Sequence, residues 1–482
     1  MNIQYIKVGS VPEIIRLLPN SSEQADSYSY PFTLSANCAW GKQEAEISIE
    51  NLRQNIEPWL TALFQSEHLN LLIGAGLSTS IQMSATGLPP AGMGWISDLA
   101  VCQSEIDTFA TQAAQAAGRD KGNIEDQIRA INELIKGLEI LTVLNTPQPE
   151  NPPAPHVAYR NLKADLKALR GELSRCLGEF SRSVSTGEYL IKNADPKRKE
   201  ETFNYLVSFL MSFASRTATR DRLHIFTTNY DRIIEVGAEL AGLRLIDRFV
   251  GSIAPVFRSS RLEVDYHYNP PGIRGEPRYL EGVARFTKLH GSLDWHEQNS
   301  AIRRFGLPFG ARSVDPFLEA EGHESNSYEQ LMIYPNSVKD RETAEYPYVE
   351  LFRDFAAATS RPNSTLVTYG YSFGDEHINR VIEDMLTVPS THIVIIAFGD
   401  PLGRIMNFIT KSGRKAQITL LMGDHLGDLK TLVDNYLPKP AIDKASIKMA
   451  ELLKQRGFMQ PKELGNSTDS EVSLWATYQL KG

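Results

Sequence analysis

Cysteine is scarce in this sequence, and long apolar runs are absent. Its 482 residues include three cysteines, Cys38, Cys102 and Cys176, and no two of them form a CxxC pair. A four-cysteine zinc site is therefore impossible, and a disulfide framework is not expected. No stretch approaches the roughly 20 apolar residues that a membrane span needs, and the first residues lack the apolar run of a secretory signal. We therefore expect a cytoplasmic protein with no membrane partner.

A positive excess of charge is also lacking. The chain has 50 basic and 58 acidic residues, which gives a net charge of −8. Proteins that coat nucleic acids usually carry a basic field, so direct nucleic-acid binding is not expected. Hydrophobic residues make up 42% and charged residues 22% of the chain, which is typical of a globular protein and excludes global disorder.

Two common phosphate-binding motifs are missing as well. The GxxxxGK[ST] loop is absent, and the GxGxxG pattern is incomplete because Thr79 stands where the third glycine would be. Ordinary kinase or ATPase chemistry thereby loses its main support. An apolar run at Asn70–Ile73 does lead into Gly74–Ser78, with the sequence GAGLS. This pattern predicts a buried strand and a turn at which backbone amides could bind a pyrophosphate, although a plain tight turn also explains it.

The order of the remaining patterns predicts an α/β fold. Helical patterns at 230–240, 375–386 and 426–437 follow strand-like runs, and the predicted strands lie at 223–228, 285–289, 365–371, 392–398 and 417–422. Such alternation is typical of a Rossmann-like parallel sheet with helices on both faces.

The predicted sheet belongs to a domain at 66–440, preceded by an N-terminal extension at 1–65 with a short helix near Ile14–Leu18. A mostly helical insertion is expected at about 100–218, interrupted by five prolines in Thr146–Pro155. An irregular subdomain is expected at about 251–345. The tail at 441–482 is interpreted as mobile or as a contact for a partner or an oligomer.

Polar residues follow three further predicted strands, in Phe226–Asp231, Lys288–Trp295 and Tyr369–His377. In an open α/β sheet, ligands bind at this edge. Each segment also has a plainer interpretation: Asn229 or Asp231 would cap a helix, as Asp375 would, and the histidine at 290 would be hydrogen-bonded within a turn. His296 lies nearby, but no third ligand has metal spacing, so no metal site is expected.

Taken together and in this order, the segments GAGLS, TTNYD, LHGS and GYSFGD resemble the sirtuin-like proteins, specifically the divergent bacterial group found in antiphage defence. The resemblance covers roughly residues 66–400. It implies that NAD is bound and that its bond between nicotinamide and ribose is cleaved. The resemblance implies that the pyrophosphate is held by Gly74, Ala75, Gly76 and Ser78. The residues facing the nicotinamide-side ribose would be Thr228, Asn229 and Asp231, with Asn229 also acting in catalysis by placing a water or a ribose hydroxyl. His290 would be the general base, and Gly370 and Ser372 would line the adenosine ribose.

Departures from the deacylase pattern favour hydrolysis of NAD to nicotinamide and ADP-ribose. The four zinc cysteines are absent, and the segment Gly87–Trp95 has no aspartate or arginine where deacylases carry Pro-Asp-Phe-Arg. The resemblance further implies NAD depletion during infection, a gated activity, a homo-oligomer and a partner protein such as a HerA-like ATPase. An NAD-dependent deacylase or ADP-ribosyl transferase, and a non-catalytic nucleotide-sensing module, remain as alternatives.

Overall fold

A computed structural model describes most of the chain up to residue 439. The described residues are 2–9, 11–20, 31–90, 94–116, 118–144, 162–216, 220–260, 264–268, 278–323, 328–333 and 346–439. The proline-rich segment Thr146–Pro155 and the tail at 441–482 lie outside them. Within the described helices, none is long and apolar enough to cross a membrane.

A large, mostly parallel sheet forms the centre of the fold and confirms the predicted α/β class. Seven strands form its parallel part, in the order β18-β17-β16-β5-β6-β12-β7. Their bounds are Ile418–Met422, His392–Ala397, Ser364–Tyr369, His68–Ile73, His224–Thr227, Val283–Lys288 and Arg244–Ile246. The first strand of this part in the chain, β5, lies between β6 and β16.

The N-terminal residues extend this sheet with antiparallel strands. β1 (Gln4–Lys7) pairs with β18, and β2 (Ile15–Pro19), β3 (Phe32–Leu34) and β4 (Glu46–Ile47) follow outward. The short helix predicted near Ile14–Leu18 is therefore wrong. Burial alternates along β2, where Ile15 and Leu17 are buried and Arg16 is exposed, as expected of a strand with one covered face.

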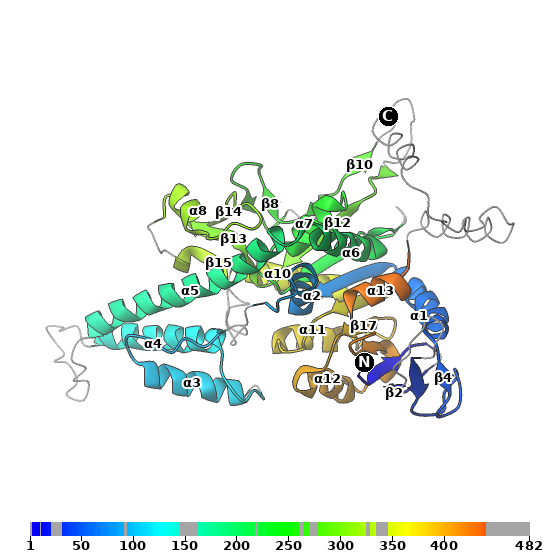
Figure 1. The fold of residues 1–482 in the computed structure, drawn as a ribbon. Coiled ribbons are helices and arrows are strands. Elements are labelled where there is room, and N and C mark those ends of the chain that lie inside the picture. The colour runs from blue at the N-terminus through cyan, green and yellow to red at the C-terminus, as the bar shows by residue number, and fades with distance from the viewer. Residues whose placement is uncertain are drawn as a thin grey trace, which may run out of the picture. The chain divides into compact units, whose positions relative to one another are not determined.

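Helices cover both faces of the parallel strands (Figure 1). Leu71 and Ile73 pack in the core on one face and Leu72 in the core on the other, because successive side chains of a strand point to opposite faces. The first face is covered by α1 (Ile49–Phe64), α2 (Ala75–Thr86), α6 (Pro196–Ala214), α7 (Ile233–Leu240) and α13 (Leu429–Asn435). The second is covered by α10 (Tyr348–Thr359), α11 (Glu376–Met385) and α12 (Arg404–Ser412).

Three helices between β5 and β6 form a helical block with its own core. They are α3 (Gln103–Ala116), α4 (Ile124–Leu144) and α5 (Leu162–Lys192). Figure 1 shows α4 beside the first half of the long α5, and α3 beside α4. The second half of α5 packs on α2, so that this block reaches the edge of the sheet at which β5 ends.

The region expected to be irregular contains a second sheet. Its order is β15-β13-β14-β9-β8, with bounds Leu331–Ile333, Gly291–Gln298, Ala301–Arg304, Val256–Phe257 and Phe249–Val250. The same region also contains the antiparallel pair of β10 (His267–Tyr268) and β11 (Arg278–Tyr279), which is separate from this sheet, and the short helix α8 (Asp315–Ala320). Because β13 begins three residues after β12 ends, Leu289 and His290 join the two sheets.

Candidate active site

A cavity of about 840 Å³ lies at the carboxyl ends of β5, β6, β12, β16 and β17. All ten residues that the sequence singles out line it: Gly74, Ala75, Gly76, Ser78, Thr228, Asn229, Asp231, His290, Gly370 and Ser372. The chain leaves β5 toward β6 on one side and later returns to place β16 on the other side. β5 is therefore the topological switch point, at which the strand order reverses. Loops that diverge from such a point leave a crevice, which is where open α/β sheets bind ligands.

Three glycines allow the loop after β5 to touch the loop after β16. A Cβ atom on Gly74 would lie 2.5 Å from the carbonyl oxygen of Gly370, and one on Gly76 would lie 2.5 Å from its Cα atom. Gly370 itself has a φ of +61°, and its own Cβ would lie 2.6 Å from the Cα atom of Gly76. Only residues without side chains fit this contact.

Hydrogen bonds across this contact occupy two of the loop amides. The Gly74 amide donates to the carbonyl of Tyr369, and the Gly76 amide donates to that of Gly370, each at 3.0 Å. The Ala75 amide, at the first position of α2, has no acceptor among the described residues. The helix start, rather than the Gly74 and Gly76 amides, is therefore the part of this loop that can bind an anion.

A network of polar side chains connects the loops after β5 and β6. The Asn229 side-chain amide donates to the carbonyl of Gly74 at 3.0 Å and to the hydroxyl of Ser78 at 2.9 Å. That hydroxyl donates to Oδ2 of Asp231 at 2.6 Å. Since the Nδ2 atom of Asn229 is used here, its Oδ1 atom is the end that can accept a hydrogen bond from a ligand.

The helix-capping interpretation applies to Asp231 and not to Asn229. Oδ1 of Asp231 accepts from the amide of Ile233, the first residue of α7, at 3.1 Å. Asp375 is the N-cap residue of α11, but its side chain makes no cap hydrogen bond. Asp231 thus fixes the start of a helix and belongs to the polar network at the same time.

Buried charges hold the loop after β6 in place. The ammonium of Lys288, which is 1% exposed, donates to the carbonyl of Asp231 and to Glu235 at 2.9 Å. Glu188 on α5 is equally buried and accepts from the backbone amide of Arg232 at 2.8 Å and from its guanidinium. Both pairs cross between elements that are far apart in the chain, so that α5 and β12 together position the residues at 228–231.

His290 lies at the junction of the two sheets and is 6% exposed. The adjacent Leu289 amide donates to the carbonyl of Thr227 at 2.8 Å, which brings the loops after β6 and β12 together. The ring centre of His290 lies 5.8 Å from that of His377, 6.3 Å from that of Tyr230 and 6.4 Å from that of Phe352. The imidazole is therefore surrounded by rings at the wall of the cavity and shielded from bulk water.

His296 lies apart from this cavity. It is completely buried, and its Nδ1 atom lies 2.7 Å from Nε2 of His323. Burial, together with His323 and Arg303, lowers the pKa of His296 to about 4. Among the residues that the structure describes, no three histidine, cysteine, aspartate or glutamate side chains gather as metal ligands would.

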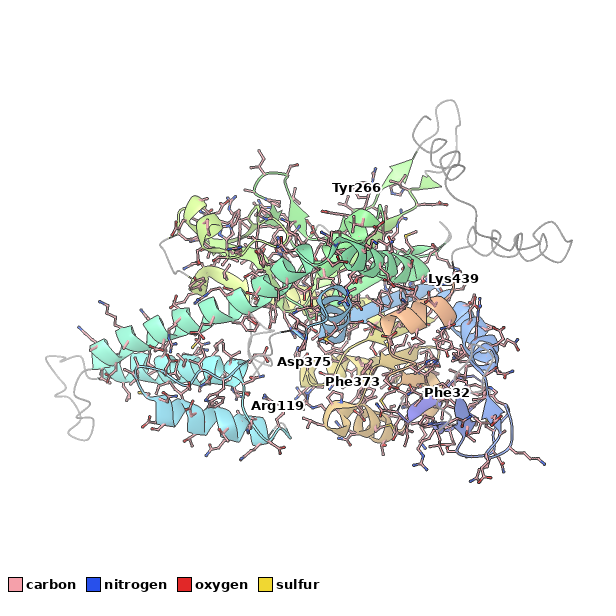
Figure 2. All side chains as sticks on the ribbon, viewed as in Figure 1. Phe32, Arg119, Tyr266, Phe373, Asp375 and Lys439 are labelled. Carbon is pink, nitrogen blue, oxygen red and sulfur yellow. The ribbon has the colours of Figure 1, made fainter. Side chains whose placement is uncertain are left out.

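Several charged residues line the cavity that the sequence patterns do not identify. Arg119 and Arg129 come from the helical block, while His377 and Arg404 come from α11 and α12. Arg119 and Asp375, both labelled in Figure 2, line it from these two parts of the fold. His377 falls within a segment that the sequence marks. The arginines carry no local signal, because only the fold brings the helical block and α12 to this edge of the sheet.

Comparison with known proteins finds a family match over part of the chain. Residues 223–415 match the family model of the SIR2-like domain. The match supports a sirtuin-like family and covers the loops after β6, β12 and β16, whereas Gly74–Ser78 precedes it. The SIR2-like family uses NAD, so the match fits an NAD-utilising enzyme. No curated protein matches the chain.

Proposed function

We propose that this protein hydrolyses NAD to nicotinamide and ADP-ribose. The observation that supports this most directly is the meeting of Asn229, His290 and the start of α2 in one cavity at the switch point of the sheet. The cavity, of about 840 Å³, falls within the range of roughly 300–1,000 Å³ typical of small-ligand sites.

The loops that line the cavity suggest how NAD would lie in it. The pyrophosphate lies at the start of α2, near the Ala75 amide, while Gly74, Gly76 and Gly370 keep this wall free of side chains. Thr228, Asn229 and Asp231 face the nicotinamide-side ribose, and Ser372 lies beside the adenosine ribose. Arg119, Arg129 and Arg404 line the cavity, and their guanidinium groups are the side chains that would bind the two phosphates.

The proposed reaction needs no acid for the leaving group. When the bond between ribose C1′ and the nicotinamide nitrogen breaks, its electron pair neutralises the positive charge of the nicotinamide ring. The oxygen of a water molecule then bonds to C1′, and His290 accepts the proton that this water loses. Oδ1 of Asn229 accepts a hydrogen bond from that water or from a ribose hydroxyl and so orients the attack.

The wider proposal is that NAD depletion serves defence against phage in the cytoplasm. It rests on the resemblance of the four loop segments to the bacterial defence group. A permanently active enzyme of this kind would harm its own cell, so we also propose that a homo-oligomer or a partner such as a HerA-like ATPase gates the activity. The helical block lines one wall of the cavity and is placed to carry such a signal.

The test is to incubate purified protein with NAD and to separate the products by chromatography. Wild type should release equal amounts of nicotinamide and ADP-ribose, and His290→Ala should be slower by about 10²–10⁴-fold, as expected when a general base is lost. His267→Ala, which removes an exposed histidine of β10, is the matched control and should keep full activity.

A gated enzyme calls for a second measurement in infected cells that express the chain. The NAD content should fall with wild type and not with His290→Ala. If neither the purified protein nor infected cells lose NAD, hydrolysis is ruled out. O-acyl-ADP-ribose from an acetyl-lysine peptide, or ADP-ribose attached to protein, would instead identify a deacylase or a transferase.

A further inference from the structure

A second cavity, of about 680 Å³, lies at the opposite end of the strands. It is lined by residues at the amino ends of β5 and β6, by Arg285 of β12 and by one face of α10. Five arginines line it, against three carboxylates: Arg222, Arg248, Arg285, Arg353 and Arg361 face Asp221, Glu350 and Asp354. Nothing in the proposed hydrolysis uses these residues.

Four of these arginines have carboxylate partners. Arg248 binds Asp354 through two nitrogens, at 2.7 Å and 2.5 Å. Arg222 lies 3.2 Å from Asp265, which stands outside the lining. The remaining pairs are Arg353 with Glu350 at 3.1 Å and Arg361 with Asp221 at 2.9 Å. Each local carboxylate is therefore already engaged.

Arg285 is different, because its guanidinium forms no hydrogen bond or ion pair with any part of the chain that the structure describes. Its Nε atom is buried without an acceptor, and so is Nη1 of Arg248. The Arg248 side chain is 7% exposed. Buried donors of charged groups are rarely left without acceptors, because water can no longer compensate for the missing hydrogen bonds.

Arg285 belongs to a row of neighbouring residues across the sheet. Asn70 of β5 lies opposite His224 of β6, which lies opposite Arg285 of β12. Burial, reinforced by Arg285 and two other arginines, lowers the pKa of His224 well below its usual value. The histidine therefore stays neutral, and its ring lies in a positive potential that the local carboxylates do not cancel.

We propose that this cavity binds a small phosphorylated anion, with Arg285 and Arg248 as its principal contacts. Guanidinium groups bind phosphate oxygens through hydrogen bonds, and Nε of Arg285 and Nη1 of Arg248 lack acceptors among the described residues. The cavity volume suits a small molecule. Among the described residues that line it, the ring side chains are those of His68 and His224, so these residues offer no large aromatic face for a nucleobase, and we propose that the ligand is recognised by charge.

The test uses pyrophosphate as the probe and titration calorimetry as the measurement. Wild type should bind it, and Arg285→Gln should bind it about tenfold more weakly or worse, as expected when a hydrogen-bonded charge is removed. Arg53→Gln is the matched control, because it also removes one arginine, from an ion pair on α1, and should leave the affinity unchanged.

The cavity of the proposed hydrolase is also lined by arginines that could bind pyrophosphate, so a third variant separates the two sites. Arg404→Gln alters that first cavity alone and should bind pyrophosphate as wild type does at the second. Binding that is lost in Arg404→Gln and kept in Arg285→Gln would overturn the proposal, as would a wild type that binds no pyrophosphate. Neither outcome depends on NAD hydrolysis, so the two proposals can fail separately.

Thermal unfolding gives an independent readout of the same site. Without the probe, Arg285→Gln should unfold at the same temperature as wild type or a higher one, because the variant loses a buried donor that has no acceptor. Pyrophosphate should raise the unfolding temperature of wild type and not that of the variant. A marked loss of stability in Arg285→Gln without the probe would show a structural role and contradict the proposal.

Discussion

The contact between the loops after β5 and β16 makes a sharp prediction about Gly370. Replacing it with alanine places a Cβ atom 2.6 Å from the Cα atom of Gly76, whereas ordinary contacts begin at 3.4 Å. The two loops would have to separate by about 0.8 Å. This movement would stretch the hydrogen bonds that join Gly74 to Tyr369 and Gly76 to Gly370.

The size of the effect follows from three contributions. A left-handed backbone costs a residue with a side chain about 1–2 kcal/mol. Forcing an atom into a packed contact costs about 1–3 kcal/mol, and weakening one net hydrogen bond costs about 1 kcal/mol. We therefore expect Gly370→Ala to lower the free energy of unfolding by about 3–6 kcal/mol, and to slow the proposed NAD hydrolysis because this edge of the sheet is displaced.

Gly413 provides a matched control. Its φ of +62° is nearly that of Gly370, but a Cβ atom there would meet nothing within 4 Å. Gly413→Ala should therefore cost only the backbone strain, about 1–2 kcal/mol. Urea unfolding followed by circular dichroism would compare the two variants. If Gly370→Ala is no more destabilising than Gly413→Ala, the close approach of the two loops does not constrain this site.

The buried charges and histidines give two further predictions. Glu188→Gln should lower the free energy of unfolding by about 3–5 kcal/mol, because it leaves the Arg232 guanidinium buried without its counter-charge. A urea titration would measure this loss. Glu201→Gln, at an exposed glutamate, is the control and should change the free energy of unfolding by less than about 0.5 kcal/mol. Burial lowers the pKa of His296 and of His392 from 6.5 to about 4. The unfolded chain therefore binds protons first, and stability should fall as the pH drops from about 6.5 to about 4, by up to about 3 kcal/mol for each group. Calorimetric scans at pH 7 and pH 5 would measure this, and a His392→Gln protein with an unchanged pH dependence would contradict it.

The parallel sheet and the position of the candidate site could be predicted from sequence because both depend on local patterns. Continuous apolar runs identified the strands, and small or polar residues followed four of them at the point where each strand ends. In a parallel sheet these ends lie at one edge, so the four segments are expected to come together, and the resemblance assigns roles to ten of their residues. The structure brings all ten to one cavity.

The antiparallel extension could not be predicted in this way. Apolar residues at 14, 15, 17 and 18 fit one face of a helix, yet they lie in or beside β2. The decisive partner is β18, because β1 pairs with it through Tyr5 and Met422. A pairing between residues more than four hundred positions apart leaves no periodic signal in either segment, so tertiary contacts override the local pattern.

The arginines of the second cavity could not be grouped from the sequence either. Arg248 follows β7, Arg285 lies within β12, and Arg361 follows α10, so each is an isolated arginine in the sequence. Only the fold brings them to one wall, and Arg285 has no hydrogen-bonding partner among the residues that the structure describes. Arg285 and His290 are five residues apart, yet they line cavities at opposite ends of β12. β12 therefore lies between the two proposed sites, with Arg285 within the strand and His290 just after its end.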